Sequence, residues 1–145
     1  MRLFHFTSES GWQGIAKWGY VVSEVPSADV GFDDEAPEDT PSVVWLTDRL
    51  NPDGTGICNN GYDGSVEIAI EFELPDADCH HWAEWAAEHG VNEAWQRMQH
   101  GLSPEHWWVL EGSPRMDEIV QVYRLERQND QRRYLAIPLR RPARG

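Results

Sequence analysis

The strict alternation of residues 66–74 limits the possible folds of this chain more than any other feature of its sequence. Successive side chains of a β-strand point to opposite faces, so a period of two predicts a strand with one buried and one solvated face. The buried set is expected to comprise Val66, Ile68, Ile70, Phe72 and Leu74, and the solvated set Glu67, Ala69, Glu71 and Glu73. Such a strand requires neighbouring strands and a hydrophobic core on one side of the sheet.

Strands and helices are interspersed along the rest of the chain. Short strands are predicted over residues 3–6, 20–22, 43–47, 107–110, 119–125 and 134–139. Helices are predicted over residues 10–18, 77–89 and 92–101. The length of 145 residues suits one domain with one core. The prediction is therefore a single α+β domain over residues 1–145, with a split, mainly antiparallel sheet and flanking helices.

The first predicted helix carries clear start and stop signals. Ser10 and Gln13 have the spacing of a capping box, in which each side chain bonds a free backbone N–H at the helix start. Gly19 suits the left-handed position that follows a helix, because glycine adopts it at low cost. A strand, a hydroxyl-rich turn and a helix are therefore expected to follow one another directly.

Two stretches without periodicity are predicted to be long loops. Residues 24–42 are rich in proline and acidic side chains, and residues 51–64 contain four glycines among several Asn and Asp residues. Loops of this length in a compact domain are most often functional or disordered. Residues 140–145 are predicted to form a tail.

Charge limits the partners of this chain. The formal net charge of -13 disfavours nonspecific binding to a nucleic acid backbone, which needs positive charge. The distribution is uneven: residues 24–39 hold seven acids and no base, whereas residues 124–144 hold seven arginines and two acids. The acidic surface would suit a nucleic-acid mimic, and the basic stretch leaves a local contact with nucleic acid or phosphate open.

The sequence predicts a cytoplasmic protein with no membrane partner. No run of 18 apolar residues exists, and the first residues lack the apolar core of a secretory signal. Cys58 and Cys79 are too few for a disulfide framework and are expected to be reduced. The run Cys79-His80-His81 lacks the ligand spacing of a zinc site, so no metal is expected.

Three residues in separate predicted strands or strand ends have chemistry that suits a nucleotide with a cationic leaving group. A histidine such as His5 can bond a ribose hydroxyl, a flat ring such as Trp45 can lie along a planar ring, and a carboxylate such as Glu118 can stabilise an oxocarbenium-like transition state. Each also has a purely structural explanation. His5 and Trp45 can be core residues, and Glu118 can be a solvated charge.

The segments that carry these residues, "LFHFTS…IAKWGYV", "VVWLTD" and "DEIVQVY", resemble in their order the ADP-ribosyltransferase fold. The resemblance is to its histidine–tyrosine–glutamate branch, which includes the poly(ADP-ribose) polymerases, the rifampin ADP-ribosyltransferases and, more distantly, the RNA 2′-phosphotransferases. It spans residues 3 to about 123. It implies that NAD is the substrate, that nicotinamide leaves, and that ADP-ribose passes to a macromolecular acceptor, protein or nucleic acid, or to water.

The resemblance also implies residues that bind NAD. His5 would hold the adenosine-side ribose, and the backbone of Phe6 would hold the nicotinamide amide. Thr7 belongs to the same binding segment, and Trp45 would occupy the place of the tyrosine beside the nicotinamide. An indole keeps the flat ring of a tyrosine but lacks its hydroxyl.

The catalytic residues implied by the resemblance are Glu118, as the acid, and His5. Asp117 and Glu111 are close enough in the sequence to take the place of Glu118. Two other functions stay open. One is a non-enzymatic acidic binding protein, such as a nucleic-acid mimic or an inhibitor of a nucleic-acid-binding partner. The other keeps the fold but transfers a 2′-phosphate from RNA.

Overall fold

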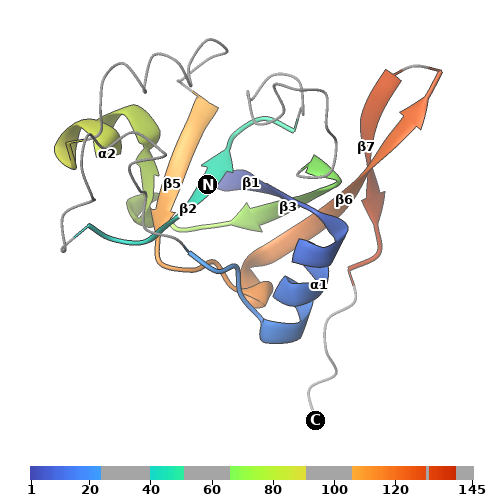
Figure 1. Ribbon diagram of the computed structural model, residues 1–145, viewed down its shortest axis with the longest axis horizontal. Helices are drawn as coiled ribbons and strands as arrows, with labels where there is room; N and C mark the ends of the chain where they lie inside the picture. The colour runs from blue at the N-terminus through green and yellow to red at the C-terminus, as the bar shows by residue number, and fades with distance from the viewer. Residues whose placement is uncertain (24–39, 51–65, 91–105, 130, 140–145) are drawn as a thin grey trace.

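The computed structural model describes residues 1–23, 40–50, 66–90, 106–129 and 131–139 (Figure 1). Most of the loop predicted over 24–42, the loop over 51–64, the helix over 92–101 and the tail over 140–145 lie outside these residues, as does Cys58. Neither helix in the described part of the chain has the length and apolar character that a membrane span requires.

The core of the fold is a seven-stranded sheet with the strand order β4-β5-β2-β1-β3-β6-β7. Every neighbouring pair of these strands is antiparallel. The elements are β1 (Arg2–Thr7), α1 (Glu9–Trp18), β2 (Val43–Thr47), β3 (Ile68–Glu73), β4 (Cys79–His81), α2 (Trp82–Glu88), β5 (Trp107–Glu111), β6 (Ile119–Gln128) and β7 (Gln131–Ile137). The predicted α+β class with a mainly antiparallel sheet is confirmed.

The sheet is narrowest at the junction between β1 and β2. These strands pair only at Phe4 and Thr47, whereas β1 pairs with β3 at six positions. The junction divides the sheet into a β4-β5-β2 half and a β1-β3-β6-β7 half. The predicted split of the sheet is therefore wrong: the seven strands form one continuous sheet, in which β1 and β2 pair at a single position.

The core lies on both faces of the sheet. On one face, Ile15 of α1 packs over apolar side chains of the central strands, including Leu3, Leu46 and Ile70. The opposite face carries two smaller clusters: tryptophans of α2 and β5 at one end, and Phe6 with Val66 and Ala69 near the other. In Figure 1, α1 and α2 lie toward different ends of the sheet.

Because β3 is covered on both faces, the prediction of one solvated face is wrong for this strand. Ala69 is fully buried and Glu71 is only 8% exposed. The Glu71 carboxylate accepts hydrogen bonds from the Tyr123 hydroxyl (2.7 Å) and from Arg2 Nη1 (2.9 Å). These partners come from the neighbouring strands β6 and β1, so the alternation alone could not show that this glutamate is paired.

The predicted end of the first helix is confirmed, but its predicted start is wrong. Gly19 has a φ of 87° and its N–H bonds the Ile15 carbonyl at 2.8 Å. The N-cap is Ser8, whose Oγ accepts from the Gly11 N–H at 3.0 Å, and Ser10 lies inside the helix. The helix begins as soon as β1 ends, so the first hydroxyl after the strand becomes the cap.

The helix predicted over residues 77–89 is correct only in its second half. Residues 76–78 form a 3₁₀ turn, and Cys79–His81 form β4, which pairs with β5. Hydrogen bonds to a strand distant in sequence override the helical spacing here. Residues 20–22 contribute only an isolated bridge, between Tyr20 and Arg115, in place of the predicted strand.

Candidate functional site

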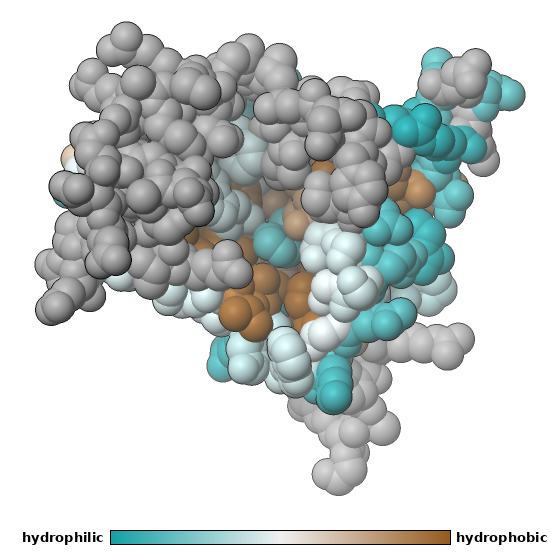
Figure 2. Space-filling view, in the orientation of Figure 1, coloured by the Kyte–Doolittle hydropathy of each residue, from teal (hydrophilic) through white to brown (hydrophobic). Residues whose placement is uncertain are grey.

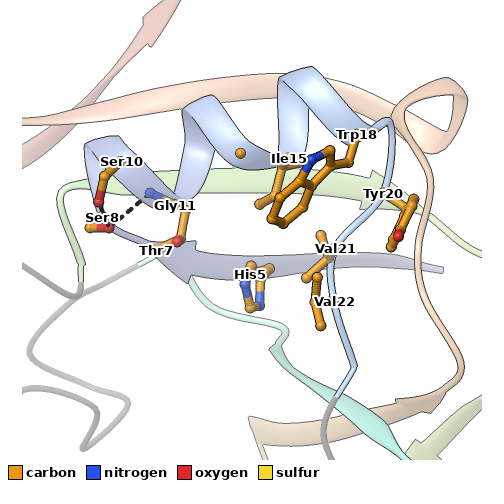
Figure 3. Close-up of a pocket in the computed structure, with 11 residues that line it drawn as sticks. His5, Thr7, Ser8, Ser10, Gly11, Ile15, Trp18, Tyr20, Val21 and Val22 are labelled. Carbon is orange, nitrogen blue, oxygen red and sulfur yellow. Dashed lines mark hydrogen bonds between the residues drawn. The ribbon is translucent and has the colours of Figure 1, made fainter.

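A cavity of about 400 Å³ opens between α1, β1 and residues 20–22, the segment that follows α1 (Figure 3). Among the described residues its lining contains no charged side chain. The residues that line it are His5, Thr7, Ser8, Ser10, Gly11, Gly14, Ile15, Trp18, Tyr20, Val21 and Val22. Two of the residues predicted to bind a nucleotide, His5 and Thr7, are therefore part of one cavity.

His5 lies in the middle of β1, beside the narrow junction with β2. Its Nδ1 is 3.0 Å from the carbonyl oxygen of Trp45. Burial lowers the pKa of His5 below the ordinary histidine value of 6.5, and the bond to the carbonyl opposes this shift. The ring is therefore neutral at pH 7. Since a carbonyl only accepts, Nδ1 carries the proton and Nε2 is a hydrogen-bond acceptor.

Hydroxyl groups line the cavity at the start of α1. Thr7 ends β1, Ser8 caps the helix, and the Oγ atoms of Ser8 and Ser10 are 3.1 Å apart. Gly11 allows this turn to lie close to the strand, because a Cβ there would be 2.1 Å from Thr7 Oγ1. The cavity lining thus combines the imidazole of His5 with neutral hydroxyl groups at the start of α1.

The close approach at Gly11 predicts opposite effects for two alanine substitutions in α1. Gly11→Ala is expected to lower the free energy of unfolding by about 1–3 kcal/mol, because the added methyl overlaps Thr7. Gly14→Ala is the matched control, since its Cβ would meet nothing closer than 3.9 Å. It is expected to stabilise the protein by about 0.5–1 kcal/mol through helix propensity. Urea denaturation measures both, and equal effects would contradict the contact at Gly11.

Phe6 and Trp45 do not present their side chains to the cavity. The Phe6 ring is buried on the opposite face, 5.6 Å from the ring of Tyr134, so only its backbone lies at the junction. The Trp45 ring packs against Trp82 (4.1 Å) and Trp107 (5.7 Å), also on the opposite face. The structure therefore joins His5 to Trp45 through the Trp45 carbonyl, and the imidazole and the indole do not face one another.

The three candidate acids lie in two different places. Glu111, at the end of β5, accepts a hydrogen bond from the indole N–H of Trp85 at 2.9 Å, toward α2. Asp117 and Glu118 lie in the 3₁₀ turn Met116–Glu118, where Glu118 Oε1 accepts from the Arg115 N–H at 3.1 Å. None of the three lines the cavity.

The turn that carries Asp117 and Glu118 is nevertheless bonded to the cavity wall. The Met116 N–H bonds the Gly19 carbonyl at 2.9 Å, and the Val21 N–H bonds the Pro114 carbonyl at 2.9 Å. The Glu118 side chain is 25% exposed, against 56% for Asp117. Asp117 and Glu118 are therefore the two acids on the turn that adjoins the cavity, and Glu118 is the less exposed of these two.

Sequence reasoning missed the aromatic side of the cavity, which Trp18 and Tyr20 form on either side of Gly19. The sequence held no clear signal for this, because Trp18 follows Trp12 and Ile15 at helical spacing and has the pattern of a core residue. Figure 2 shows apolar surface exposed in the middle of the viewed face, beside α1. The sequence spacing around Ser10 predicts a helix start and gives no sign that the hydroxyls line a cavity.

The described residues contain no group of three or more His, Cys, Asp or Glu side chains that could hold a metal ion. Cys79 is buried in β4 and its Sγ lies 3.5 Å from the Pro75 carbonyl. Burial raises the pKa of this thiol to about 11, so it is protonated at neutral pH.

The features of the site are thus a neutral histidine, a set of hydroxyls and an exposed aromatic wall around an uncharged cavity. Comparisons with protein-family models, with curated proteins and with solved structures found no match to this chain.

Proposed function

We propose that this protein binds NAD and transfers ADP-ribose from it to a macromolecular acceptor, or to water as an NAD glycohydrolase. The observation that supports this proposal most is the position of His5. Its neutral ring lies in a cavity of about 400 Å³, lined by hydroxyls, at the junction of the two halves of the sheet. Its Nε2, the acceptor nitrogen, suits the hydroxyl of a ribose.

The uncharged lining suits the nucleoside part of a dinucleotide. In the proposed reaction the bond between C1′ of the ribose and the nicotinamide nitrogen breaks, and nicotinamide leaves with the electron pair. A nucleophile of the acceptor, or water, then bonds C1′ and releases a proton. A carboxylate stabilises the positive charge that develops on the sugar, as in glycoside hydrolysis. Glu118 is the residue proposed for this role.

NAD binding is tested by replacing His5. His5→Ala is expected to weaken NAD binding about tenfold, the effect of about 1.4 kcal/mol, because a hydrogen bond to the ligand is lost. His89→Ala is the matched control: His89 Nδ1 also lies close to a tryptophan carbonyl, that of Trp85 at 2.8 Å, but the residue is the C-cap of α2 and does not line the cavity. Isothermal titration calorimetry measures both affinities.

The wild-type protein tests the function itself. NAD at concentrations well above its Kd is expected to raise the melting temperature, and incubation is expected to release nicotinamide. Incubation with a cell extract then identifies any species that gains ADP-ribose. A protein that neither binds NAD nor releases nicotinamide would refute the proposal.

The net charge of -13 favours a second candidate, a non-enzymatic acidic protein that binds a basic partner. This candidate predicts a complex that dissociates as salt is raised, since ionic strength screens charge attraction. Salt-sensitive binding of a nucleic-acid-binding protein, together with no response to NAD, would favour it over the enzyme.

A further inference from the structure

The strand β7 forms one end of the sheet. It is seven residues long and is the last strand in the order of the sheet, so β6 is its only neighbouring strand in the described part of the chain. Figure 1 shows β7 at the outer end of the sheet, beside β6. An outer strand presents a row of backbone N–H and C=O groups that another extended segment can bond. We therefore examined what the side chains of β7 place along this edge.

Three side chains alternate along one face of β7: Arg133, Leu135 and Ile137. This face lies toward α1, because Ile137 packs on the same cluster as Ile15. Arg133 is exposed, and it forms no ion pair with its cross-strand neighbour Glu126 or with any other described residue. Leu135 is 41% exposed. The face therefore carries a cation, then an exposed apolar side chain, then a side chain that packs on the core.

A hollow of about 440 Å³ lies at the end of this face, between α1 and the end of β7. It is lined by Trp12, Ala16, Arg124, Ile137 and Pro138, and it shares no lining residue with the cavity around His5. The one charged group of this lining is the Arg124 guanidinium, whose Nε bonds Oε1 of Glu9 at 2.7 Å. The hollow therefore suits an uncharged, apolar side chain.

Protection of the edge explains only part of this surface. Edge strands often carry cations, because charge prevents two edges from pairing, and the arginines of β7 would serve this purpose. It gives no reason for the exposed Leu135 or for an apolar hollow beside the end of the strand. A free backbone edge with side-chain sites at alternate positions is what strand addition requires, since backbone bonds supply affinity and pockets supply specificity.

We propose that β7 binds an extended, acidic segment of a partner protein as an added antiparallel strand. Antiparallel pairing matches every other pair in the sheet and is slightly more stable per residue than parallel pairing. From its N-terminus, the segment carries at alternate positions an apolar side chain that enters the hollow beside Ile137, an apolar side chain beside Leu135 and an acid beside Arg133. The net charge of -13 disfavours nucleic acid as the occupant of this edge.

The test uses a capped seven-residue peptide in which threonine alternates with leucine, valine and glutamate, in that order, and fluorescence anisotropy with the full chain. Arg133→Glu is expected to weaken binding about tenfold, because an exposed ion pair is replaced by repulsion of similar size. Lys17→Glu is the matched control, since it makes the same change of charge at an exposed lysine outside β7 and outside the hollow. Its affinity is expected to equal that of wild type.

The hollow is tested by Ala16→Leu, which fills it from α1. Binding is expected to weaken about tenfold, because the leucine of the peptide is no longer buried. In this variant, changing that leucine of the peptide to alanine is expected to cause little further loss. Gln13→Leu is the control, because it adds the same side chain at an exposed position of α1 outside the hollow. Thermal melts show that each variant is folded.

Two N-methylated forms of the peptide test the strand pairing itself. Successive N–H groups of a strand point to opposite edges, so methyl groups on alternate nitrogens block one edge only. One form is expected to lose at least tenfold in affinity and the other to bind as the parent peptide does. Equal affinities of the two forms would overturn strand addition, as would a wild type that does not bind the parent peptide.

Other occupants of the edge give different results. A dimer in which the amides of β7 gain protection from hydrogen exchange as protein concentration rises would assign the edge to a second copy. An oligonucleotide that binds wild type but not Arg133→Glu, with no binding of the peptide, would assign it to nucleic acid. Either result would overturn the peptide assignment. None of these measurements involves NAD, so they stand or fall separately from the proposed function.

Discussion

Replacing Glu118 with glutamine is expected to lower the rate of nicotinamide release about 100-fold to 1000-fold, while NAD binding stays measurable. A loss of this size in the rate is typical when an enzyme loses one group that stabilises the charge developing in the transition state. A glutamine has the same shape and can still accept the hydrogen bond that Glu118 Oε1 accepts from the Arg115 N–H at 3.1 Å. The substitution therefore removes the negative charge and leaves the turn beside Gly19 and Tyr20 in place.

The other two acids provide matched controls of the same chemistry. Glu111→Gln alters the carboxylate that bonds Trp85, toward α2, and Asp117→Asn alters the more exposed neighbour on the same turn. Both are expected to keep the rate within a few-fold of wild type. A large loss in Asp117→Asn with an unchanged Glu118→Gln would move the acid to Asp117. Unchanged rates in all three variants would place the catalytic group elsewhere.

Replacing Trp82 with alanine is expected to lower the free energy of unfolding by about 3–5 kcal/mol, the usual cost of truncating a buried aromatic residue. Trp82 is fully buried, and its ring centroid lies 4.1 Å from that of Trp45 and 5.8 Å from that of Trp85. Removing it leaves a cavity between α2 and the β2 and β5 strands. For a chain of this length the melting temperature is expected to fall by roughly 10 °C.

Trp18→Ala is the matched control for this effect. Its indole is 59% exposed, so its removal is expected to change the free energy of unfolding by about 0.5 kcal/mol or less. Trp82→Phe, which keeps part of the buried ring, is expected to fall between alanine and wild type and remains informative if the alanine variant does not fold. Urea denaturation of the three variants gives the comparison. A loss below about 1 kcal/mol for Trp82→Ala would contradict the packing of α2 on the sheet.

The elements that the sequence determined by itself are those with signals inside their own segments. The apolar run Val43–Thr47 is a strand with the predicted bounds, and the left-handed glycine at position 19 ends α1 as predicted. The β1 strand that carries His5 and the mainly antiparallel α+β class are likewise as predicted. In each case the signal lies within a few neighbouring residues: the hydrophobic periodicity of a strand, its strand propensity, or a glycine that ends a helix.

The tertiary structure decided which face each side chain occupies. The alternation within β3 predicts that Glu71 is solvated. It is buried, and its carboxylate accepts hydrogen bonds from Tyr123 and Arg2 on the two neighbouring strands. His5 and Trp45 read as partners, but the antiparallel register places their rings on opposite faces of the sheet. Local periodicity determines that successive side chains of a strand alternate between the two faces of the sheet. It does not determine which strands or helices pack against each face.

The cavity itself also depends on tertiary contacts. The sequence indicated His5 and Thr7, but Tyr20 lines the same cavity in a segment that is bonded to residues 114–116, nearly a hundred positions away. The sequence by itself therefore predicted the strand β1, the helix α1 and His5 as a candidate binding residue. Only the tertiary structure decided what faces that histidine, because a site is formed by segments whose meeting depends on strand order and on hydrogen bonds between distant residues.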